Sequence, residues 1–213
     1  MKPDENDLLL IIDVQNDFCS DGALAVPGGD DVVPVINKLQ PCFRHIAITQ
    51  DWHPEHHGSF ASSHPGKDPF STIEMPYGEQ TLWPDHCIQG SGGAEFHAEL
   101  NTDPAALIIR KGMNPAIDSY SAFFENDRTT STGLSGYLRK LDIKRVFCAG
   151  LAYDFCVRFS AGDASREGFK TFVISDACRA IDIDNSAALT TEFLEKNNIE
   201  LITSELISPE SIR

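Results

Sequence analysis

The sequence predicts an α/β protein with a three-layer α/β/α fold, in which a mainly parallel sheet of about six strands lies between helices. Six short apolar runs recur along the chain, and most are continuous rather than alternating, as expected for strands covered on both faces. Helical patterns separate several of these runs, which favours parallel pairing. The length of 213 residues and the 41% hydrophobic content are typical of one globular domain, residues 1–213.

The predicted elements follow one another in a regular order. The expected strands are 8–12, 46–49, 106–109, 146–151, 171–175 and 199–203. The expected helices are 30–39, 134–141, 155–167 and 185–196. The first helix is the least regular of the four because Pro34 lies within its first turns.

One connection is much longer than the others. Residues 51–103 are rich in Gly, Pro, His and Ser and show only weak periodicity. A long irregular excursion in a compact domain is usually functional. We therefore expect this segment to contribute to a site, and its first residues follow directly from the second strand.

Composition argues against several classes of partner and location. The net charge of −15 repels phosphate backbones and anionic headgroups, so nucleic acid and membrane surfaces are not expected as partners. The apolar stretch 8–12, closed by Asp13, is too short for a signal peptide or a membrane span. The six cysteines show no CxxC spacing, so we expect reduced thiols in a cytoplasmic protein.

Chemically active side chains follow the ends of the predicted strands. Asp13 ends the first strand, Asp51 and His53 follow the second, Lys111 follows the third after Arg110, and the fourth leads to Cys156. In open parallel sheets, ligands bind at the carboxyl ends of the strands. Each residue alone could be a cap or a solvated charge, but together they predict a site.

The excursion begins with a pattern that suits a metal ion. Asp51 and His53 are two residues apart, so both side chains point to the same side of an extended segment. His86 is the best candidate for a third ligand because Pro84 stiffens the chain before it. One oxygen and two imidazoles suit Zn(II), Fe(II) or Mn(II). The alternative is a polar loop decorated by histidines, which also include His56, His57, His64 and His97.

The stretch 146–160 predicts a buried strand, a tight turn and a helix with Cys156 in its first turn. Asp154 is expected to cap that helix, and free amides of the first turn should favour a thiolate at Cys156. Such an elbow also presents amides to an oxyanion. The alternative is a small buried apolar cysteine.

Five segments in order resemble the nicotinamidases, members of the isochorismatase-like cysteine hydrolases, over nearly the whole chain. The segments are IIDVQNDFCSDGALAVPGG (11–29), TQDWHPEHHGSFA (49–61), LWPDHCIQGSGGAEFH (82–97), RKGMNPAIDSYSAFF (110–124) and AGLAYDFCVRFSAGDA (149–164). The resemblance implies an isochorismatase-like fold and a catalytic triad, carried onto Asp13, Lys111 and Cys156.

The resemblance also implies a metal site and an oxyanion hole. One divalent metal ion, expected to be zinc with iron or manganese as alternatives, would be bound by Asp51, His53 and His86. Some members use a further histidine, and His57 is the matching position. A cis peptide bond is implied at Leu151–Ala152, with the amides of Ala152 and Cys156 facing the oxyanion.

The substrate implied by the resemblance is an aromatic carboxamide. Nicotinamide would be hydrolysed to nicotinate and ammonia in NAD salvage, and pyrazinamide is expected as a further substrate. Asp13 would act as general acid and base, and the metal ion would anchor the pyridine nitrogen. The pocket would be lined by Phe18, Leu24, Trp83 and Tyr120. The chain departs from the family at Tyr153, where members commonly have threonine, and its oligomeric state is left open.

Three other functions compete with this interpretation. A sister amidase, carbamoyl hydrolase or isochorismatase-type hydrolase would share the fold, but the last needs no thiol nucleophile. An Fe(II) oxygenase could use Asp51, His53 and His86, but it leaves Lys111 and Cys156 without a role. An acidic interaction domain would have no need of these groups at converging strand ends.

Overall fold

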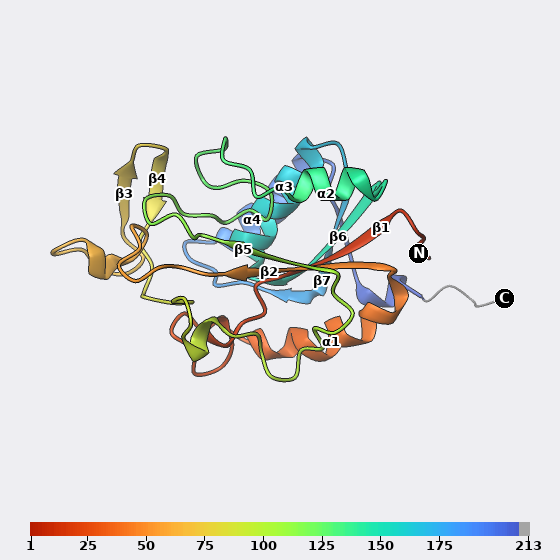
Figure 1. Ribbon diagram of the computed structural model, residues 1–213, viewed down its shortest axis with the longest axis horizontal. Helices are drawn as coiled ribbons and strands as arrows, with labels where there is room; N and C mark the ends of the chain where they lie inside the picture. Colours follow the sequence, from red (N-terminus) through yellow and green to blue (C-terminus); the bar gives the residue numbers. More distant parts are fainter. Residues whose placement is uncertain (209–213) are drawn as a thin grey trace.

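The computed structural model describes residues 1–208, so the last five residues of the predicted domain, 209–213, lie outside the described residues. Its main sheet has six strands in the order β5-β2-β1-β6-β7-β8, and all neighbouring strands are parallel (Figure 1). The strands are β1 (Asp7–Ile12), β2 (His45–Asp51), β5 (Leu107–Lys111), β6 (Arg145–Leu151), β7 (Lys170–Arg179) and β8 (Glu200–Ile202). All six predicted strands are confirmed, with ends that differ by a few residues.

Helices cover both faces of the sheet. Figure 1 shows α1 below the sheet and the other three helices above it. The helices are α1 (Val32–Leu39), α2 (Leu134–Lys140), α3 (Arg158–Arg166) and α4 (Ser186–Lys196). Pro34 is the third residue of α1, where its missing N–H removes no intrahelical hydrogen bond. The predicted three-layer fold is therefore confirmed.

The central strand β1 shows why the apolar runs are continuous. Leu9 and Ile11 pack in the hydrophobic cluster that includes α1. Leu8, Leu10 and Ile12 pack in the second cluster, which includes α2, α3 and α4. All five side chains are 0% exposed. Because successive side chains of a strand point to opposite faces, a sheet buried on both faces requires apolar residues at every position.

The long excursion contains an antiparallel hairpin that the sequence did not predict, formed by β3 (Thr72–Met75) and β4 (Gly78–Thr81). Each strand has only four residues with mixed polarity, too few to show a period. Isolated bridges then pair His53, two residues after β2, with Ile88, and Phe60 with Trp83. These bridges carry its later residues back beside the end of β2.

All six cysteines are free thiols, as expected from their spacing. Within residues 1–208, none of the helices combines the length and hydrophobicity that crossing a membrane requires.

Candidate active site

The carboxyl ends of four neighbouring strands bring the predicted residues together. Lys111 ends β5 and lies in register with Asp51, which ends β2. Asp13 directly follows β1, and Cys156 follows β6 after a short turn. We call Asp13, Lys111 and Cys156 the thiol cluster. Parallel pairing alone explains why groups so distant in sequence lie at one edge.

The ammonium group of Lys111 lies at the centre of the site. Its Nζ is 2.8 Å from Asp13 Oδ2, 2.7 Å from Asp51 Oδ1 and 3.4 Å from Cys156 Sγ. It also donates to the carbonyl of Ser119 at 2.9 Å, and its side chain is fully buried. One buried cation thus holds two carboxyl groups and a thiol.

The neighbouring Arg110 points away from these groups. Its guanidinium lies 3.9 Å from the ring centroid of Trp52 and donates to the side chain of Gln50. Successive residues of a strand face opposite sides of the sheet, so only Lys111 reaches the site.

The two aspartates that share Lys111 have opposite pKa shifts. Burial raises the pKa of Asp13, and Asp51 adds to the rise, whereas Lys111 and Thr49 oppose it. Burial also acts to raise the pKa of Asp51, but Lys111 and His53 outweigh it and hold that pKa well below its usual range. Two titratable groups whose environments separate their pKa values are suited to different chemical roles. Asp51 is fitted to remain an anion, and Asp13 is fitted to gain and lose a proton.

Cys156 lies in a turn of π-helix, Tyr153–Val157, that leads into α3. The amides of Phe155 and Val157, on either side of it, both donate to the carbonyl of Ala152 at 3.1 Å. Burial raises the pKa of the Cys156 thiol well above its usual value, although Lys111 opposes the rise. The expectation that this turn favours a thiolate is therefore wrong for the structure as it stands, because complete burial outweighs the nearby cation and amides.

Asp154 does not cap the helix after the turn, contrary to the sequence prediction. The first helical turn follows Ala152 and has no side-chain cap. The Asp154 carboxylate instead accepts from the amides of Ile181 at 3.1 Å and Asp182 at 2.7 Å, and from the hydroxyl of Ser186. It therefore anchors the turn to the segment that precedes α4. The peptide bond Leu151–Ala152 is cis, as the resemblance implied.

Asp51, His53 and His86, which we call the histidine cluster, have the donor arrangement of a metal site. Asp51 Oδ2 is 3.4 Å from His53 Nε2 and 3.7 Å from His86 Nε2. His53 Nδ1 lies 2.9 Å from the carbonyl of Gly112, and His86 Nδ1 lies 2.8 Å from that of Pro84. Carbonyls accept only, so both Nδ1 atoms carry a proton, and in the neutral imidazoles both Nε2 atoms keep a lone pair.

The buried atom His53 Nε2 fits the role of a metal donor. Among residues 1–208 it has no hydrogen-bond partner, although buried polar atoms are nearly always paired. The ligand atoms of all three residues lie within 4.8 Å of one another. One carboxylate and two neutral imidazoles fit a divalent transition-metal ion with positions left for other ligands.

His57 lies beside the histidine cluster but differs in its hydrogen bonds. Its ring centroid is 4.5 Å from that of His53. Its Nε2 faces the carbonyl of Asn114 at 2.8 Å, and its Nδ1 lies 2.8 Å from the hydroxyl of Ser59. Both ring nitrogens are thus engaged by the protein, so His57 has no lone pair directed at the cluster.

A small pocket of about 20 Å³ lies between the two clusters. All four predicted lining residues, Phe18, Leu24, Trp83 and Tyr120, border it, together with Asp51, His86, Ala152 and Cys156. This volume holds about one water molecule. An aromatic ligand therefore requires the surrounding rings to move apart.

Three further residues line the pocket that sequence reasoning did not identify: Asp118, Phe155 and Ile181. Phe155 precedes Cys156, and its ring lies 4.8 Å from that of Trp83 in an edge-to-face contact. Its position next to Cys156 in the sequence was the only feature that could have identified Phe155 as a pocket residue. Asp118 and Ile181 come from loops whose course the sequence does not reveal.

A buried hydrogen-bond network supports the pocket wall. Gln80 donates to the carboxylate of Asp118 at 2.9 Å and to the hydroxyl of Tyr120 at 2.8 Å. The indole of Trp83 donates to the same hydroxyl at 3.0 Å. The unpredicted hairpin thus reaches the pocket through Gln80 of β4 and orients two of the predicted rings.

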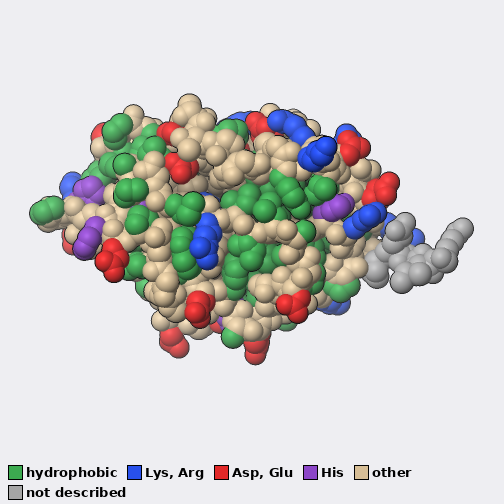
Figure 2. All heavy atoms as spheres, viewed as in Figure 1, with side chains coloured by type: hydrophobic (Ala, Val, Ile, Leu, Met, Phe, Trp, Pro, Cys, Tyr) green, Lys and Arg blue, Asp and Glu red, His purple; other side chains and the backbone are tan. Residues whose placement is uncertain are grey.

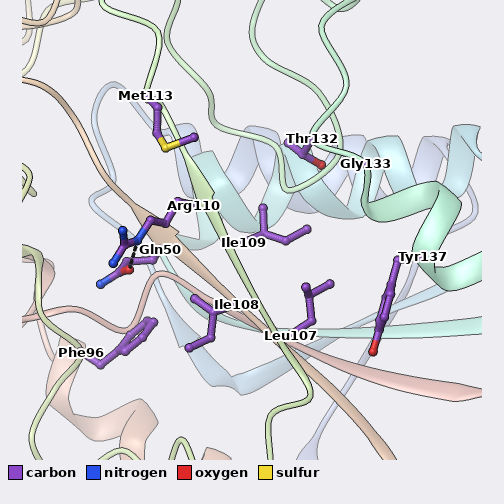
Figure 3. Close-up of a pocket in the computed structure, with 10 residues that line it drawn as sticks. All are labelled: Gln50, Phe96, Leu107, Ile108, Ile109, Arg110, Met113, Thr132, Gly133 and Tyr137. Atoms are coloured by element: carbon purple, nitrogen blue, oxygen red, sulfur yellow. Dashed lines mark hydrogen bonds between the residues drawn. The ribbon is translucent and has the colours of Figure 1, made fainter.

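A larger hollow of about 710 Å³ lies along the outer edge of β5 (Figure 3). Ile108 and Met113 border it and are about half exposed, and Figure 2 shows hydrophobic side chains gathered on this face. None of the residues of either cluster lines it. We therefore place the chemistry in the small pocket, where the titratable groups converge.

The chain is similar to known proteins over nearly its whole length. The model of the isochorismatase domain matches residues 7–205. A nicotinamidase of Acinetobacter baylyi is 51% identical over 207 residues, covering 97% of this chain and 97% of that protein.

Two solved structures are similar over nearly their whole length. PnC1 from L. infantum in complex with nicotinate is 39% identical with a TM-score of 0.87, and the match covers 99% of both chains. The pyrazinamidase of Pyrococcus horikoshii in complex with zinc is 32% identical with a TM-score of 0.75, covering 93% of this chain and 99% of that one. Fold, site and relatives lead to one conclusion: the chain belongs to the isochorismatase family and is an enzyme of the amide-hydrolysing kind within it.

Proposed function

We propose that the protein is a metal-dependent cysteine amidohydrolase that converts nicotinamide to nicotinate and ammonia, with pyrazinamide as a further substrate. One observation carries the proposal: a thiol, an ammonium and a carboxyl group are in contact beside the histidine cluster, at the base of an aromatic pocket. The relatives named nicotinamidase and the related structure with nicotinate support the same substrate class.

Cys156 is the proposed nucleophile, and Asp13 is its proton acceptor. The buried thiol holds its proton, so attack requires a base beside it, and the raised pKa of Asp13 suits that task. As sulfur bonds to the carboxamide carbon, the thiol proton passes to Asp13. Asp13 then protonates the leaving amine, ammonia departs, and a thioester remains.

Water completes the reaction. Asp13 takes a proton from the water molecule that attacks the thioester carbon. The carbon–sulfur bond breaks, nicotinate forms, and the proton returns to Cys156. The same carboxyl group serves as base, acid and base again. This alternation suits Asp13, because burial raises its pKa while Lys111 opposes the rise.

Lys111 positions these groups and stabilises negative charge. Burial acts to lower its pKa, but Asp13 and Asp51 outweigh that effect and hold the pKa well above its usual value. It therefore stays an ammonium during turnover, 3.4 Å from Cys156 Sγ, and stabilises the thiolate as it forms.

The amides of Ala152 and Cys156 are the proposed oxyanion hole. Both belong to the turn that Asp154 anchors to the segment before α4. Preorganised donors of this kind typically contribute about 10²- to 10³-fold to the rate each.

Asp51, His53 and His86 are the proposed ligands of one divalent metal ion. Zinc is proposed because the three donors suit it and because the related P. horikoshii structure contains zinc. When bound, the ion supplies a Lewis acid that can coordinate a pyridine nitrogen and so fix the ring. His57 is left out of the ligand set because both of its ring nitrogens are engaged.

Phe18, Leu24, Trp83 and Tyr120 are the proposed contacts of the substrate ring, with Phe155 and Ile181 added from the structure. Aromatic side chains favour edge and offset contacts with an aromatic ligand. The pocket must widen from about 20 Å³ to admit one, so substrate binding and ring movement are coupled.

We further propose one domain over the chain, a cytoplasmic location and a role in NAD salvage. The family model spans residues 7–205, which supports the single domain. Six free cysteines suit a reducing compartment. The net charge of −15 disfavours nucleic acid and anionic membrane as partners.

The test is ammonia release from nicotinamide by purified protein, beside a sample stripped of metal with a chelator. We expect release by the intact protein, loss after stripping, and recovery when zinc is returned. Benzamide, which lacks the ring nitrogen, is the matched control and should be hydrolysed far more slowly. If metal-loaded protein releases no ammonia from nicotinamide but does so from another small amide, the chain is a sister amidase.

A further inference from the structure

A second hollow lies outside the active site, between α3, α4 and the loop before α2, and is lined by three arginines. Its volume is about 170 Å³. One water molecule needs only about 10–15 Å³, so the hollow can hold a larger ligand. It is lined by Arg128, Arg158, Phe159, Gly162, Arg166 and Phe193, and we call it the arginine pocket.

Two of the arginines are held in place by a buried carboxylate. Arg128 Nη1 lies 3.0 Å and 3.1 Å from the two oxygens of Asp163, and Arg166 Nη1 lies 2.8 Å from one of them. The Asp163 side chain is only 4% exposed, whereas those of Arg128 and Arg166 are 43% and 57% exposed. Asp163 thus holds two guanidinium groups from the protein interior, and the solvent-exposed parts of both groups remain accessible.

Arg158 is held by aromatic rings instead of a carboxylate. Its guanidinium carbon lies 4.8 Å from the ring centroid of Phe193 and 5.7 Å from that of Phe159. Within residues 1–208 it forms no ion pair, and burial lowers its pKa. A partly buried guanidinium without an anion retains donors that can bind one.

The floor of the pocket depends on a glycine within α3. A Cβ at Gly162 would lie 2.9 Å from Cζ of Phe193, so a side chain there would push the ring out of place. Gly162 therefore maintains the close packing of α4 on α3 that places Phe193 beneath Arg158.

The charge of the pocket is opposite to that of the whole protein. Among the groups that line or directly contact the pocket, three guanidinium groups face one buried carboxylate, which leaves two positive charges in excess on a chain whose net charge is −15. Other acidic groups nearby bind partners outside the pocket: Asp154, whose charge acts on Arg158, accepts from two backbone amides, Asp127 accepts from Thr130, and Glu192 pairs with Lys196. In so acidic a chain, a local positive potential arises only where several cationic side chains are held close together, as they are in this pocket.

We propose that the arginine pocket binds a phosphoryl group, either inorganic phosphate or the phosphate of a small phosphate monoester. A phosphate monoester carries a charge of about −1.5 to −2 at pH 7, which matches the excess of two positive charges. Planar guanidinium groups bind tetrahedral oxyanions through paired donors. Sites for drug-sized ligands typically have volumes of about 300–1,000 Å³. The arginine pocket is smaller than that, so only the phosphoryl end of a larger molecule fits inside it.

The test is calorimetric titration of the metal-loaded protein with inorganic phosphate and, separately, with adenosine monophosphate, at constant ionic strength. We expect one site per chain for at least one of them. Tighter binding of inorganic phosphate assigns the free ion, and tighter binding of the nucleotide assigns the monoester. Acetate is the control for a simple carboxylate and should bind at least tenfold more weakly.

Variants decide the location, because a metal ion in the active site could also bind phosphate. Arg158→Gln and Arg166→Gln should each weaken binding at least tenfold, since each removes a charged donor. Arg139→Gln is the matched control, because Arg139 is exposed and pairs with Glu167 elsewhere, and it should bind as the unchanged protein does. Unchanged melting temperatures would show that the variants are folded. The proposal is overturned if neither ligand binds at one site per chain, if acetate binds equally well, or if both pocket variants retain full affinity.

Discussion

The thiol cluster and the histidine cluster lie side by side, yet they are assembled from different parts of the chain. Lys111 is the last residue of β5, and Asp13 and Cys156 follow strands of the main sheet directly or after a single turn. The histidine cluster takes Asp51 from a strand end, but His53 and His86 come from the excursion, whose parts pair through isolated bridges. The first cluster is thus positioned by the sheet, and the second by a long loop.

The two clusters also differ in how their polar atoms are satisfied. In the thiol cluster, Lys111 Nζ lies 2.8 Å from Asp13 Oδ2, a close contact between opposite charges. In the histidine cluster, His53 Nε2 is buried and its nearest acidic atom, Asp51 Oδ2, is 3.4 Å away. The protein's own groups therefore pack tightly in the thiol cluster, whereas the looser histidine cluster has the donor spacing that suits a metal ion.

The largest expected effect comes from removing the thiol. Cys156→Ala should lower kcat for nicotinamide by at least about 10³-fold, because no other group can form the thioester. Zinc content and melting temperature should stay unchanged, since the histidine cluster is untouched. Turnover by ammonia release and metal content by atomic absorption test both statements.

Cys42→Ala is the matched control for the thiol, because Cys42 is only partly buried and lies outside the pocket. It should retain full activity. Substantial turnover by Cys156→Ala would contradict the covalent mechanism.

Removing the shared cation should break both clusters. Lys111→Met leaves the carboxyl groups of Asp13 and Asp51 facing each other in a buried site, which should cost about 3–5 kcal/mol of stability in metal-free protein. The loss should be larger at pH 8 than at pH 6. Without Lys111 the pKa of Asp13 rises further. The folded protein then keeps Asp13 protonated to higher pH than the unfolded chain does, so the free energy of unfolding falls as pH rises through the folded pKa.

Urea unfolding of the metal-free protein at both pH values measures this effect. Lys140→Met, at an exposed position near the end of α2, is the control and should change stability little at either pH. Equal destabilisation at pH 6 and pH 8 would exclude the proposed repulsion between the carboxylates.

A change in the histidine cluster alone should have a smaller effect. His53→Ala should weaken zinc binding by more than the about 10- to 100-fold that is typical of losing an outer-shell partner, and raise KM for nicotinamide, while Cys156 remains reactive toward a thiol reagent. Competition with a chromogenic chelator measures the zinc affinity.

His56→Asn is the control for this variant. His56 is exposed, and its positive φ of 61° is tolerated by asparagine. It should bind zinc normally. Unaltered zinc affinity in His53→Ala would remove His53 from the ligand set.

The smallest predicted effect is a shift in pH dependence. Thr49 donates to Asp13 Oδ1 at 2.6 Å and so lowers the pKa of that carboxyl group. Thr49→Val should therefore raise this pKa further and move the acid limb of kcat/KM to higher pH by about one unit, because the free enzyme needs ionised Asp13.

The pH profile of Thr171→Val serves as the reference, because Thr171 is buried in β7 and donates only to a backbone carbonyl. Its acid limb should not move. A Thr49→Val profile that coincides with it would mean that another group controls the limb.

Much of the fold could be predicted from the sequence because its signals are local. The continuous apolar run of β1 indicates a strand buried on both faces, and each face has been found to pack against helices. The parallel arrangement then places Asp13, Asp51 and Lys111 at one edge without further information. The hairpin of β3 and β4 escaped prediction because strands of four mixed residues carry no period.

The sequence by itself determined the order of the layers and which side chains meet at the strand ends, because both depend on periodicity and parallel pairing. Only the tertiary structure decided their electrostatic state. Burial raised the pKa of Cys156 where the local turn predicted the reverse, and Asp154 bound the segment before α4 instead of its own helix. Desolvation and long-range hydrogen bonds depend on which distant segments exclude water, and that depends on the packing of the complete chain.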